Sequence, residues 1–248
     1  MVRIAVYKSA EMTSIMRAQL HHLFDLTYDQ ADHEYLDKSL SILRYIAVAR
    51  FMEDVPIEPD YGRTLVSGGD CGQDTDQLVG FALGETRQLD LPGLPAQQVG
   101  LAGLCCIDPR YRRRGLFRDL ERSVIREGLD KLLNGRILIA GRMAHPASFR
   151  IMASNPTVVP KYNVVPTEFQ QQVGKIVADN YGVSSLDPIT FVCKGNGHPI
   201  GYPRMTVKVD PEEWRVFASV DRANGDSLLA LSWIPDAPSQ TFDKQHST

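Results

Sequence analysis

One segment of the chain constrains the fold more than any other, because it joins a strand, a basic turn and a helix. An apolar stretch, Val99–Ile107, runs into Asp-Pro and then into a turn with several arginines and one glycine, Gly115. This order places a helix N-terminus, with its unsatisfied N–H groups and positive dipole end, beside the end of a strand. Because Gly115 has no Cβ, an anion can approach the backbone closely. The segment therefore predicts a binding site for a phosphate, and for a pyrophosphate in particular.

The helix behind this turn is predicted from its apolar periodicity. Leu116, Leu120 and Val124 recur at four-residue steps, and the stripe continues through Phe117, Ile125, Leu129 and Leu132. Charged residues are assigned to the opposite face, and an Asn-Gly pair at 134–135 predicts the end of the helix. An apolar strand, Ile137–Ala140, follows directly. Strand, turn, helix and strand together are typical of a βαβ-like crossover.

The turn resembles the acyl-CoA-binding motif of the GNAT N-acyltransferase superfamily, written Q/R-x-x-G-x-G/A and followed by a helix. Here it reads Arg112-x-x-Gly115-x-Phe117 after Ile-Asp-Pro-Arg-Tyr, with Phe117 where the family prefers Gly or Ala. The resemblance covers about residues 99–141, and the flanks fit the family in element order. It implies acetyl-CoA or another short acyl-CoA as co-substrate, with no metal. The implied cofactor-binding residues are Cys105, Cys106, Ile107, Arg112, Arg113, Arg114, Gly115, Leu116 and Phe117.

The arginines of the turn also allow other interpretations. Five arginines lie between Arg110 and Arg118, and such a run can be a nucleic-acid patch, a localisation signal or a solvated face. The whole chain, however, has a formal net charge of −3. Nucleic-acid-binding surfaces spread positive charge over a face and often intersperse aromatic residues. A phosphate-bearing cofactor is therefore favoured over nucleic acid.

Composition places the chain among soluble globular proteins. A length of 248 residues suits one large domain or two small ones, and 43% hydrophobic with 23% charged residues is ordinary. No apolar run approaches the ~20 residues of a membrane span, and the N-terminus alternates like a first strand rather than a secretory signal. The four cysteines show no metal or redox spacing, and neither do the His21-His22 and His33-Glu34 pairs. We expect a cytoplasmic protein without membrane contact.

The order of the remaining elements supports the same fold. Before the turn we expect strands at Val2–Tyr7, Arg44–Phe51 and Leu78–Arg87, and a short segment at Arg63–Val66. We also expect a helix at Glu11–Asp29, capped by Ser9 and with Ile15 facing inward, and a second helix at Glu34–Leu43. After it we expect helices at His145–Ser154, Glu168–Asn180 and Asp210–Val220, with strands at Ile189–Lys194 and Leu228–Ile234. The glycines at 195–201 lack the G-x-G-x-x-G spacing and predict a turn.

The predicted fold class is α/β (α+β): a GNAT-like mixed, mostly antiparallel central sheet flanked by helices, with an elaborated C-terminal third. We expect a single domain over residues 1–235, an acyl-CoA-binding core at about 99–142, and a flexible tail at 236–248.

Acyl transfer to an amine needs a base, donors that polarise the thioester carbonyl, and an acid for the leaving thiolate. In the resembled family the acyl group sits where the strands before and after the pyrophosphate helix splay apart. His145 just follows the second of these strands, and predicts either a base or carbonyl donor or a cap of its own helix. Glu85 is the nearest carboxylate in the expected acceptor cleft, or else it is solvent-facing or pairs with Arg87. Tyr162 lies where the family commonly places a tyrosine acid.

The resulting hypothesis is an acyl-CoA-dependent N-acyltransferase, an N-acetyltransferase that transfers the acyl group directly in a ternary complex. A small-molecule amine is preferred over a protein as acceptor, and the apolar C-terminal strands leave a homodimer open. Two alternatives stay open: a catalytically silent CoA-binding or regulatory module, and a nucleic-acid-binding module.

Overall fold

The computed structural model describes residues 1–52, 77–129, 135–205 and 207–235 of the chain. A seven-stranded sheet in the order β1-β3-β4-β5-β6-β9-β7 forms its centre, and a second sheet pairs β2 with β8. Every neighbouring pair in the large sheet is antiparallel except β5 and β6, which are parallel. The predicted mixed, mostly antiparallel sheet flanked by helices is confirmed.

The strands of the large sheet are β1 (Val2–Lys8), β3 (Tyr45–Phe51), β4 (Gln77–Leu89), β5 (Gln97–Ile107), β6 (Ile137–Met143), β7 (Val192–Cys193) and β9 (Ser227–Ile234). The small sheet joins β2 (Tyr28–Asp29) and β8 (Tyr202–Pro203). The α-helices are α1 (Ser14–Thr27), α2 (His33–Ile42), α3 (Leu116–Glu127), α4 (Pro146–Ala153) and α5 (Glu168–Asn180), and short 3-10 helices cover Ser9–Glu11, Pro109–Tyr111 and Pro211–Phe217.

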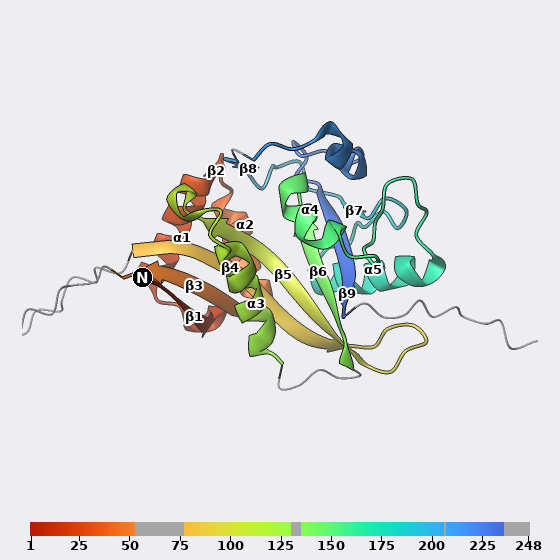
Figure 1. The fold of residues 1–248 in the computed structure, drawn as a ribbon, viewed down its shortest axis with the longest axis horizontal. Coiled ribbons are helices and arrows are strands. Elements are labelled where there is room, and N and C mark those ends of the chain that lie inside the picture. Colours follow the sequence, from red (N-terminus) through yellow and green to blue (C-terminus); the bar gives the residue numbers. More distant parts are fainter. Residues whose placement is uncertain (53–76, 130–134, 206, 236–248) are drawn as a thin grey trace, which may run out of the picture.

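The sheet has an apolar core on each of its faces. On one face α3 buries Leu116, Leu120 and Val124 against β3 and β4, and Figure 1 shows this helix lying across the sheet. The other face carries the larger core, to which α1, α2 and α5 contribute. Successive side chains of a strand point to opposite faces, so Cys105 packs with the α3 cluster and Cys106 with the larger core. Both thiols are free.

The two parallel strands diverge, as Figure 1 shows. Their ladder covers four residue pairs, from Val99 with Leu138 to Ala102 with Gly141. At the same level the register of β5 against β4 shifts opposite Leu83, which is the mark of a bulge, and a bulge bends its strand. Beyond the ladder β6 stays paired with β9 through Met143. We call the space between the diverging ends of β5 and β6 the gap.

Two helices have different ends from those predicted. The α1 helix begins at Ser14, because the Thr13 hydroxyl accepts the N–H of Met16 at 3.1 Å and so provides the cap. The Ser9 hydroxyl is buried and donates instead to the carbonyl of Leu43 at 2.7 Å. With this start, Ile15 lies on the first turn and is 72% exposed, so the prediction that it faces inward was wrong.

The α3 helix ends at Glu127, earlier than the Asn-Gly pair at 134–135 predicted. The Thr86 hydroxyl of β4 donates to the carbonyl of Ile125 at 2.8 Å, and Gly128 lies directly over Thr86. The last turn of α3 therefore packs against β4. Residues 130–134 lie outside the described residues, as do Arg63–Val66, Cys71 and the predicted tail at 236–248.

The C-terminal third differs most from the prediction. The strand expected at Ile189–Lys194 is reduced to β7, because the Asp187 carboxylate accepts the N–H groups of Ile189 and Thr190 at 2.8 and 3.1 Å and makes a turn there. The helix expected to reach Val220 is the 3-10 helix Pro211–Phe217. By contrast, α5 has its predicted cap, a full capping box between Thr167 and Gln170. No helix in the described ranges has the length and apolarity of a membrane span.

Candidate active site

The start of α3 differs from the starts of the other described α-helices. Its N-cap is Gly115, in the left-handed region with φ of +80°, and no side chain caps this end. The other α-helices are each capped by a side chain, from Thr13, Asp32, His145 and Thr167. The first-turn N–H groups of α3 therefore point outward without a side-chain acceptor. Such an end favours a bound anion, because N–H groups and helix dipole act together.

The arginines of the turn have different tasks. Arg112 donates from Nε to the Ile107 carbonyl at 3.0 Å and from Nη1 to the Arg204 carbonyl, so it ties the turn to β5 and to the segment after β8. Arg114 stacks on the Tyr111 ring with its guanidinium carbon 5.5 Å from the ring centre. Arg113 and Arg114 are exposed, and Arg113 has a left-handed φ of +65°. Arg112 thus shapes the turn, while the next two arginines place positive charge around it.

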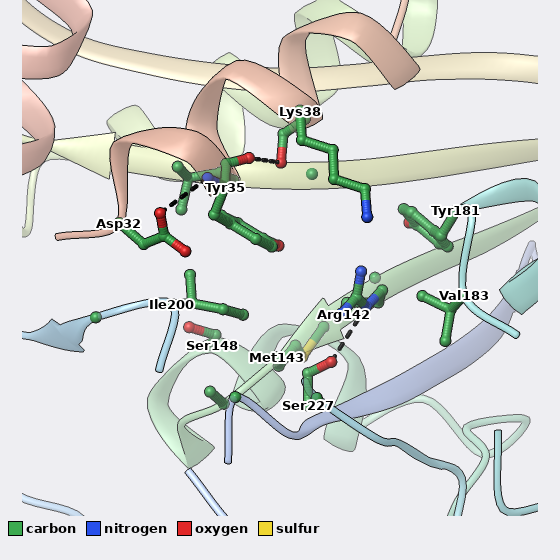
Figure 2. Close-up of a pocket in the computed structure, with 18 of the residues that line it drawn as sticks. Asp32, Tyr35, Lys38, Arg142, Met143, Ser148, Tyr181, Val183, Ile200 and Ser227 are labelled. Carbon is green, nitrogen blue, oxygen red and sulfur yellow. Dashed lines mark hydrogen bonds between the residues drawn. The ribbon is translucent and has the colours of Figure 1, made fainter. Parts of the chain in front are cut away.

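A cavity of about 460 Å³ opens where β5 and β6 part. Strand residues Ala102–Cys105 and Gly141–Met143 line it, together with Phe117 and Glu121 of α3. Its other walls come from α2, the end of α5 and the segments around β7 and β9, as Figure 2 shows in part. The cavity therefore joins the end of β5 and the first turn of α3 to elements far away in the sequence.

The predicted cofactor-binding residues divide into three groups. Cys105 and Phe117 line the cavity. Ile107 contributes its carbonyl to Arg112, and the Leu116 side chain packs in the α3 core, so only its backbone is available to a ligand. Cys106 is buried in the larger core, where burial raises the pKa of its thiol to about 12. Burial also raises the pKa of Cys105 well above its usual value, so neither thiol supplies a thiolate nucleophile.

Tyr181, at the C-cap of α5, joins the two strands at the start of the gap. Its hydroxyl lies 2.8 Å from the Ala102 carbonyl of β5 and 2.9 Å from the Ala140 carbonyl of β6, and its single proton can be shared between them. Burial raises the pKa of this phenol well above 10, so it stays protonated. Sequence reasoning placed the tyrosine at Tyr162, which is half exposed, carries Arg215 over its ring at 5.5 Å and does not line the cavity.

His145 lines the cavity and also caps α4. Its Nδ1 accepts the N–H of Ala147 at 3.1 Å, so the predicted capping role is observed. Burial lowers the pKa of the imidazole, and the charges of Arg222 and Arg150 lower it further. A neutral imidazole that accepts at Nδ1 carries its proton on Nε2. His145 is thereby arranged as a hydrogen-bond donor rather than as a base.

Glu85 lies outside the cavity lining. Its carboxylate accepts from Arg87 Nε at 2.5 Å and from the Arg44 N–H at 3.0 Å. Arg87 also donates to the carbonyls of Ile42 and Asn180, which end α2 and α5. This is the pairing that the sequence left open as the alternative role, and it fastens two helix ends to β4.

Glu121 is a cavity residue that sequence reasoning missed. It lies one turn after Phe117 on α3, and both side chains face the gap rather than the sheet core. Burial raises the pKa of its carboxyl to about 8, so the group is mostly uncharged at pH 7. The periodicity of α3 offered one signal: Phe117 and Glu121 share a helix face four residues apart, beside the Leu116–Leu120–Val124 stripe.

The histidine pairs singled out in the sequence are local. His21 meets Asp37 at 3.1 Å and His33 meets Asp25 at 2.7 Å. Within the described ranges no three His, Cys, Asp or Glu side chains converge as metal ligands. The glycine-rich residues at 195–201 form an irregular segment with a bend at Gly197 and His198 in place of a regular turn, and several of them line the cavity.

Comparisons with known proteins give matches among solved structures alone. No family model matches the chain, and no curated protein does. The aminoglycoside N-acetyltransferase AAC(6')-Iy in complex with CoA is 15% identical over 62% of this chain and 85% of its own, with a TM-score of 0.38. The ribosomal-protein-S18-alanine N-acetyltransferase from Escherichia coli is 11% identical over 97% and 99%, with a TM-score of 0.40. Naa20 from Chaetomium thermophilum, bound to a bisubstrate analogue, is 11% identical over 93% and 85%, with a TM-score of 0.36.

The fold itself is established by the strand order and the geometry around α3. The large-sheet strand β1, the helices α1 and α2 and the large-sheet strands β3 and β4 precede the crossover. The crossover joins two parallel strands that diverge, and the helix between them starts at a left-handed glycine. This is the GNAT-like arrangement of strands and helices that the sequence resemblance predicted.

Proposed function

We propose that the protein is an acyl-CoA-dependent N-acyltransferase that transfers acetyl or another short acyl group to a small amine within a ternary complex. One observation carries the proposal: the gap opens beside the uncapped start of α3 and leads into the cavity. The CoA pyrophosphate binds the first-turn N–H groups of α3. The pantetheine arm lies in the gap, where the β5 edge beyond Ala102 is no longer paired with β6. The thioester then reaches the start of the gap and faces the cavity.

In the proposed reaction the amine nitrogen attacks the thioester carbonyl, the C–N bond forms and the C–S bond breaks. Glu121, mostly protonated at pH 7, gives its proton to the leaving thiolate sulfur and regains one from the amine nitrogen through water. His145, with its proton on Nε2, is the donor for the developing oxyanion. The sequence predicted Glu85 and Tyr162 as the carboxyl group and tyrosine of the site. We assign these positions to Glu121 and Tyr181 instead, because Glu121 and Tyr181 line the cavity.

Thiol release from acetyl-CoA, measured with a panel of primary amines, tests the activity. We expect release that depends on the amine and saturates with it. A catalytically silent module would bind CoA in calorimetry but would release no thiol with any amine above the background of hydrolysis.

The nucleic-acid alternative is disfavoured by the local engagement of the arginines. Arg110 pairs with Asp108 at 2.6 Å, Arg112 holds two carbonyls, and Arg114 stacks on Tyr111. Affinities for CoA and for a DNA duplex, each measured across salt concentrations, separate the two cases. A steep salt dependence of DNA binding together with absent CoA binding would overturn the proposal.

A further inference from the structure

The cavity contains a cation that lacks a counter-ion. Arg142, on β6 directly after the last residue of the β5–β6 ladder, is half-buried and lines the cavity. Its Nε donates to the Ser227 hydroxyl at 3.1 Å, and within the described part of the chain it forms no ion pair. Arg87 and Arg150, by comparison, each meet a carboxylate at 2.5 Å. A partly buried charge without a partner is costly, which suggests that a ligand supplies the missing anion.

A second cation faces the same space. Lys38 of α2 points its ammonium into the cavity towards Arg142 and Tyr181, as Figure 2 shows. Among the described residues Lys38 takes part in no ion pair. Tyr35, one turn earlier on α2, points its ring into the same space. The two cations come from different walls, α2 and β6, and line the same cavity, so an anion bound there is attracted by both.

The three carboxyl groups that line the cavity do not neutralise this pair. Burial raises the pKa of the Glu121 carboxyl to about 8, so this group is mostly uncharged at pH 7. The Asp32 carboxylate is engaged by the N–H of Tyr35 at 3.1 Å as the cap of α2, and lies at the other end of the view in Figure 2. Glu34 is exposed on the first turn of the same helix. Lys194, a third cation of the lining, is already paired with Asp226 at 2.9 Å. The unsatisfied charge at the Arg142 end is therefore positive.

We infer that the acyl acceptor is a small amine that carries a carboxylate, and that Arg142, assisted by Lys38, binds this carboxylate. The role of this ligand as the acyl acceptor rests on the proposed function. The anion site rests on the cavity residues alone. Arginine binds a carboxylate through two parallel N–H donors. Arg142 bonds the Ser227 hydroxyl through Nε and also meets the Cys193 thiol, a weak acceptor that a carboxylate can displace. The same charges disfavour polycationic acceptors.

The test compares amino acids with their α-carboxamides, which retain the amine but lose the negative charge. The amine of a carboxamide is the less basic one, so a preference for the acid cannot arise from a larger fraction of free amine. We expect kcat/KM in thiol release to favour the acid by at least about tenfold. Arg142→Gln should reduce this preference below about threefold, and Lys38→Gln should reduce it less.

Two controls separate loss of the site from general damage. Arg136 precedes the same strand and does not line the cavity, so Arg136→Gln should keep the preference. The affinity for CoA of Arg142→Gln should match that of the wild type, and its melting temperature should not be lower, because no ion pair is lost and a costly partly buried charge is removed. Equal use of acid and carboxamide by the wild type, or an unchanged preference in Arg142→Gln, would overturn the inference.

A direct binding measurement keeps the inference testable if no amine releases thiol. The same amino acids and their N-acetyl derivatives are then titrated by calorimetry into the CoA-saturated protein. Saturable binding that Arg142→Gln abolishes would support the carboxylate site even though the proposed reaction had failed. Absence of saturable binding by every member of the panel would overturn it.

Discussion

The two sides of the gap are assembled in different ways. The β5–α3 side comes from one continuous stretch, residues 97–127, and offers a ligand chiefly backbone groups at a strand edge and a helix start. The β6 side brings together Lys38, Arg142, Tyr181 and Ser227 from four separate parts of the chain, and offers side chains. In the proposed function the first side binds the acyl donor and the second binds the acceptor. The comparison suggests that a local sequence motif can specify binding of the acyl donor, while long-range packing specifies binding of the acyl acceptor.

The largest expected effect concerns Glu121, the one titratable α3 side chain in the gap. If it is the proton donor, Glu121→Gln should lower kcat by about 10²–10³-fold with little change in CoA affinity. The wild-type rate should fall as the pH rises through about 8, because the carboxyl then ionises, and the variant should lose this limb. Glu127→Gln, at the exposed end of the same helix, is the matched control and should retain full activity.

The same group gives a stability signature. A carboxyl whose pKa is raised on folding favours the folded state below its unfolded pKa of about 4.3 and loses that advantage as the pH rises towards 8. The free energy of unfolding of the wild type should therefore decrease between about pH 4.5 and 8 relative to Glu121→Gln, measured in urea. Equal pH profiles for the two proteins would remove Glu121 from both roles, and would leave the α3 side of the gap with backbone groups alone as its contribution to the chemistry.

The next effect concerns Asp226, which holds the cavity wall on the acceptor side. Burial alone would raise the pKa of this carboxyl, but donors from Gly195, Lys194, Asn224 and Asp221 lower it to about 2. At pH 7, Asp226→Asn should unfold about 2 kcal/mol more easily. This difference should be present above about pH 4 and be lost as the pH falls through 2, because the wild-type carboxyl then also becomes protonated.

Asp226→Asn also sharpens the comparison between the two sides. Since the loops that it holds lie on the acceptor side, KM for the amine should rise while the dissociation constant of CoA changes little. A larger loss of CoA affinity than of amine affinity would show that the two sides are not independent.

A substitution at Gly115 tests the β5–α3 side of the gap, where backbone groups are expected to bind CoA. A β-branched side chain at a left-handed φ of +80° is strained and stands between the helix start and an anion. Gly115→Val should therefore weaken CoA binding at least tenfold, or by ~1.4 kcal/mol, in isothermal calorimetry. Gly93→Val is the matched control, because Gly93 has a similar φ of +66° in open space away from α3. It should lose a comparable amount of stability and retain its CoA affinity.

The smallest effect is expected from Arg114, an exposed charge beside the turn. Arg114→Ala should weaken CoA binding by about twofold to fivefold in low salt, and by less at high salt, because exposed charges are screened. Complete loss of CoA binding at every salt concentration would contradict the view that backbone groups do most of the work on this side.

Sequence reasoning succeeded where the signals were local. The order of the large-sheet strands and α-helices up to α5, the glycine start of α3 and the Thr167 cap of α5 could all be predicted, because each depends on a few neighbouring residues. The choice of Thr13 over Ser9 was missed, since both are good caps and the burial of Ser9 against Leu43 decided between them. Glu121 was missed because charged residues on an amphipathic helix are expected to face solvent, and this one faces a gap that exists only in the folded sheet.

Tyr181 illustrates the same limit on the other side of the gap. It ends α5, some forty residues after β6 in the chain, and only the packing of α5 on the larger core brings its hydroxyl to Ala102 and Ala140. The sequence placed the tyrosine at Tyr162 by element order alone. No spacing rule connects these positions, so their meeting could not be predicted from the residues.

The divergence of β5 and β6 has a consequence for solubility as well as for binding. A strand with free N–H and C=O groups normally invites another protein to add a strand and to aggregate. Here the free portion of β5 lies inside the sheet, with β6 beside it, α3 over one face and the larger core on the other. A neighbouring polypeptide needs about 4.8 Å of lateral room and an open approach to pair with such an edge. The unpaired edge of β5 is therefore open to a narrow ligand but closed to a strand from another copy of the chain.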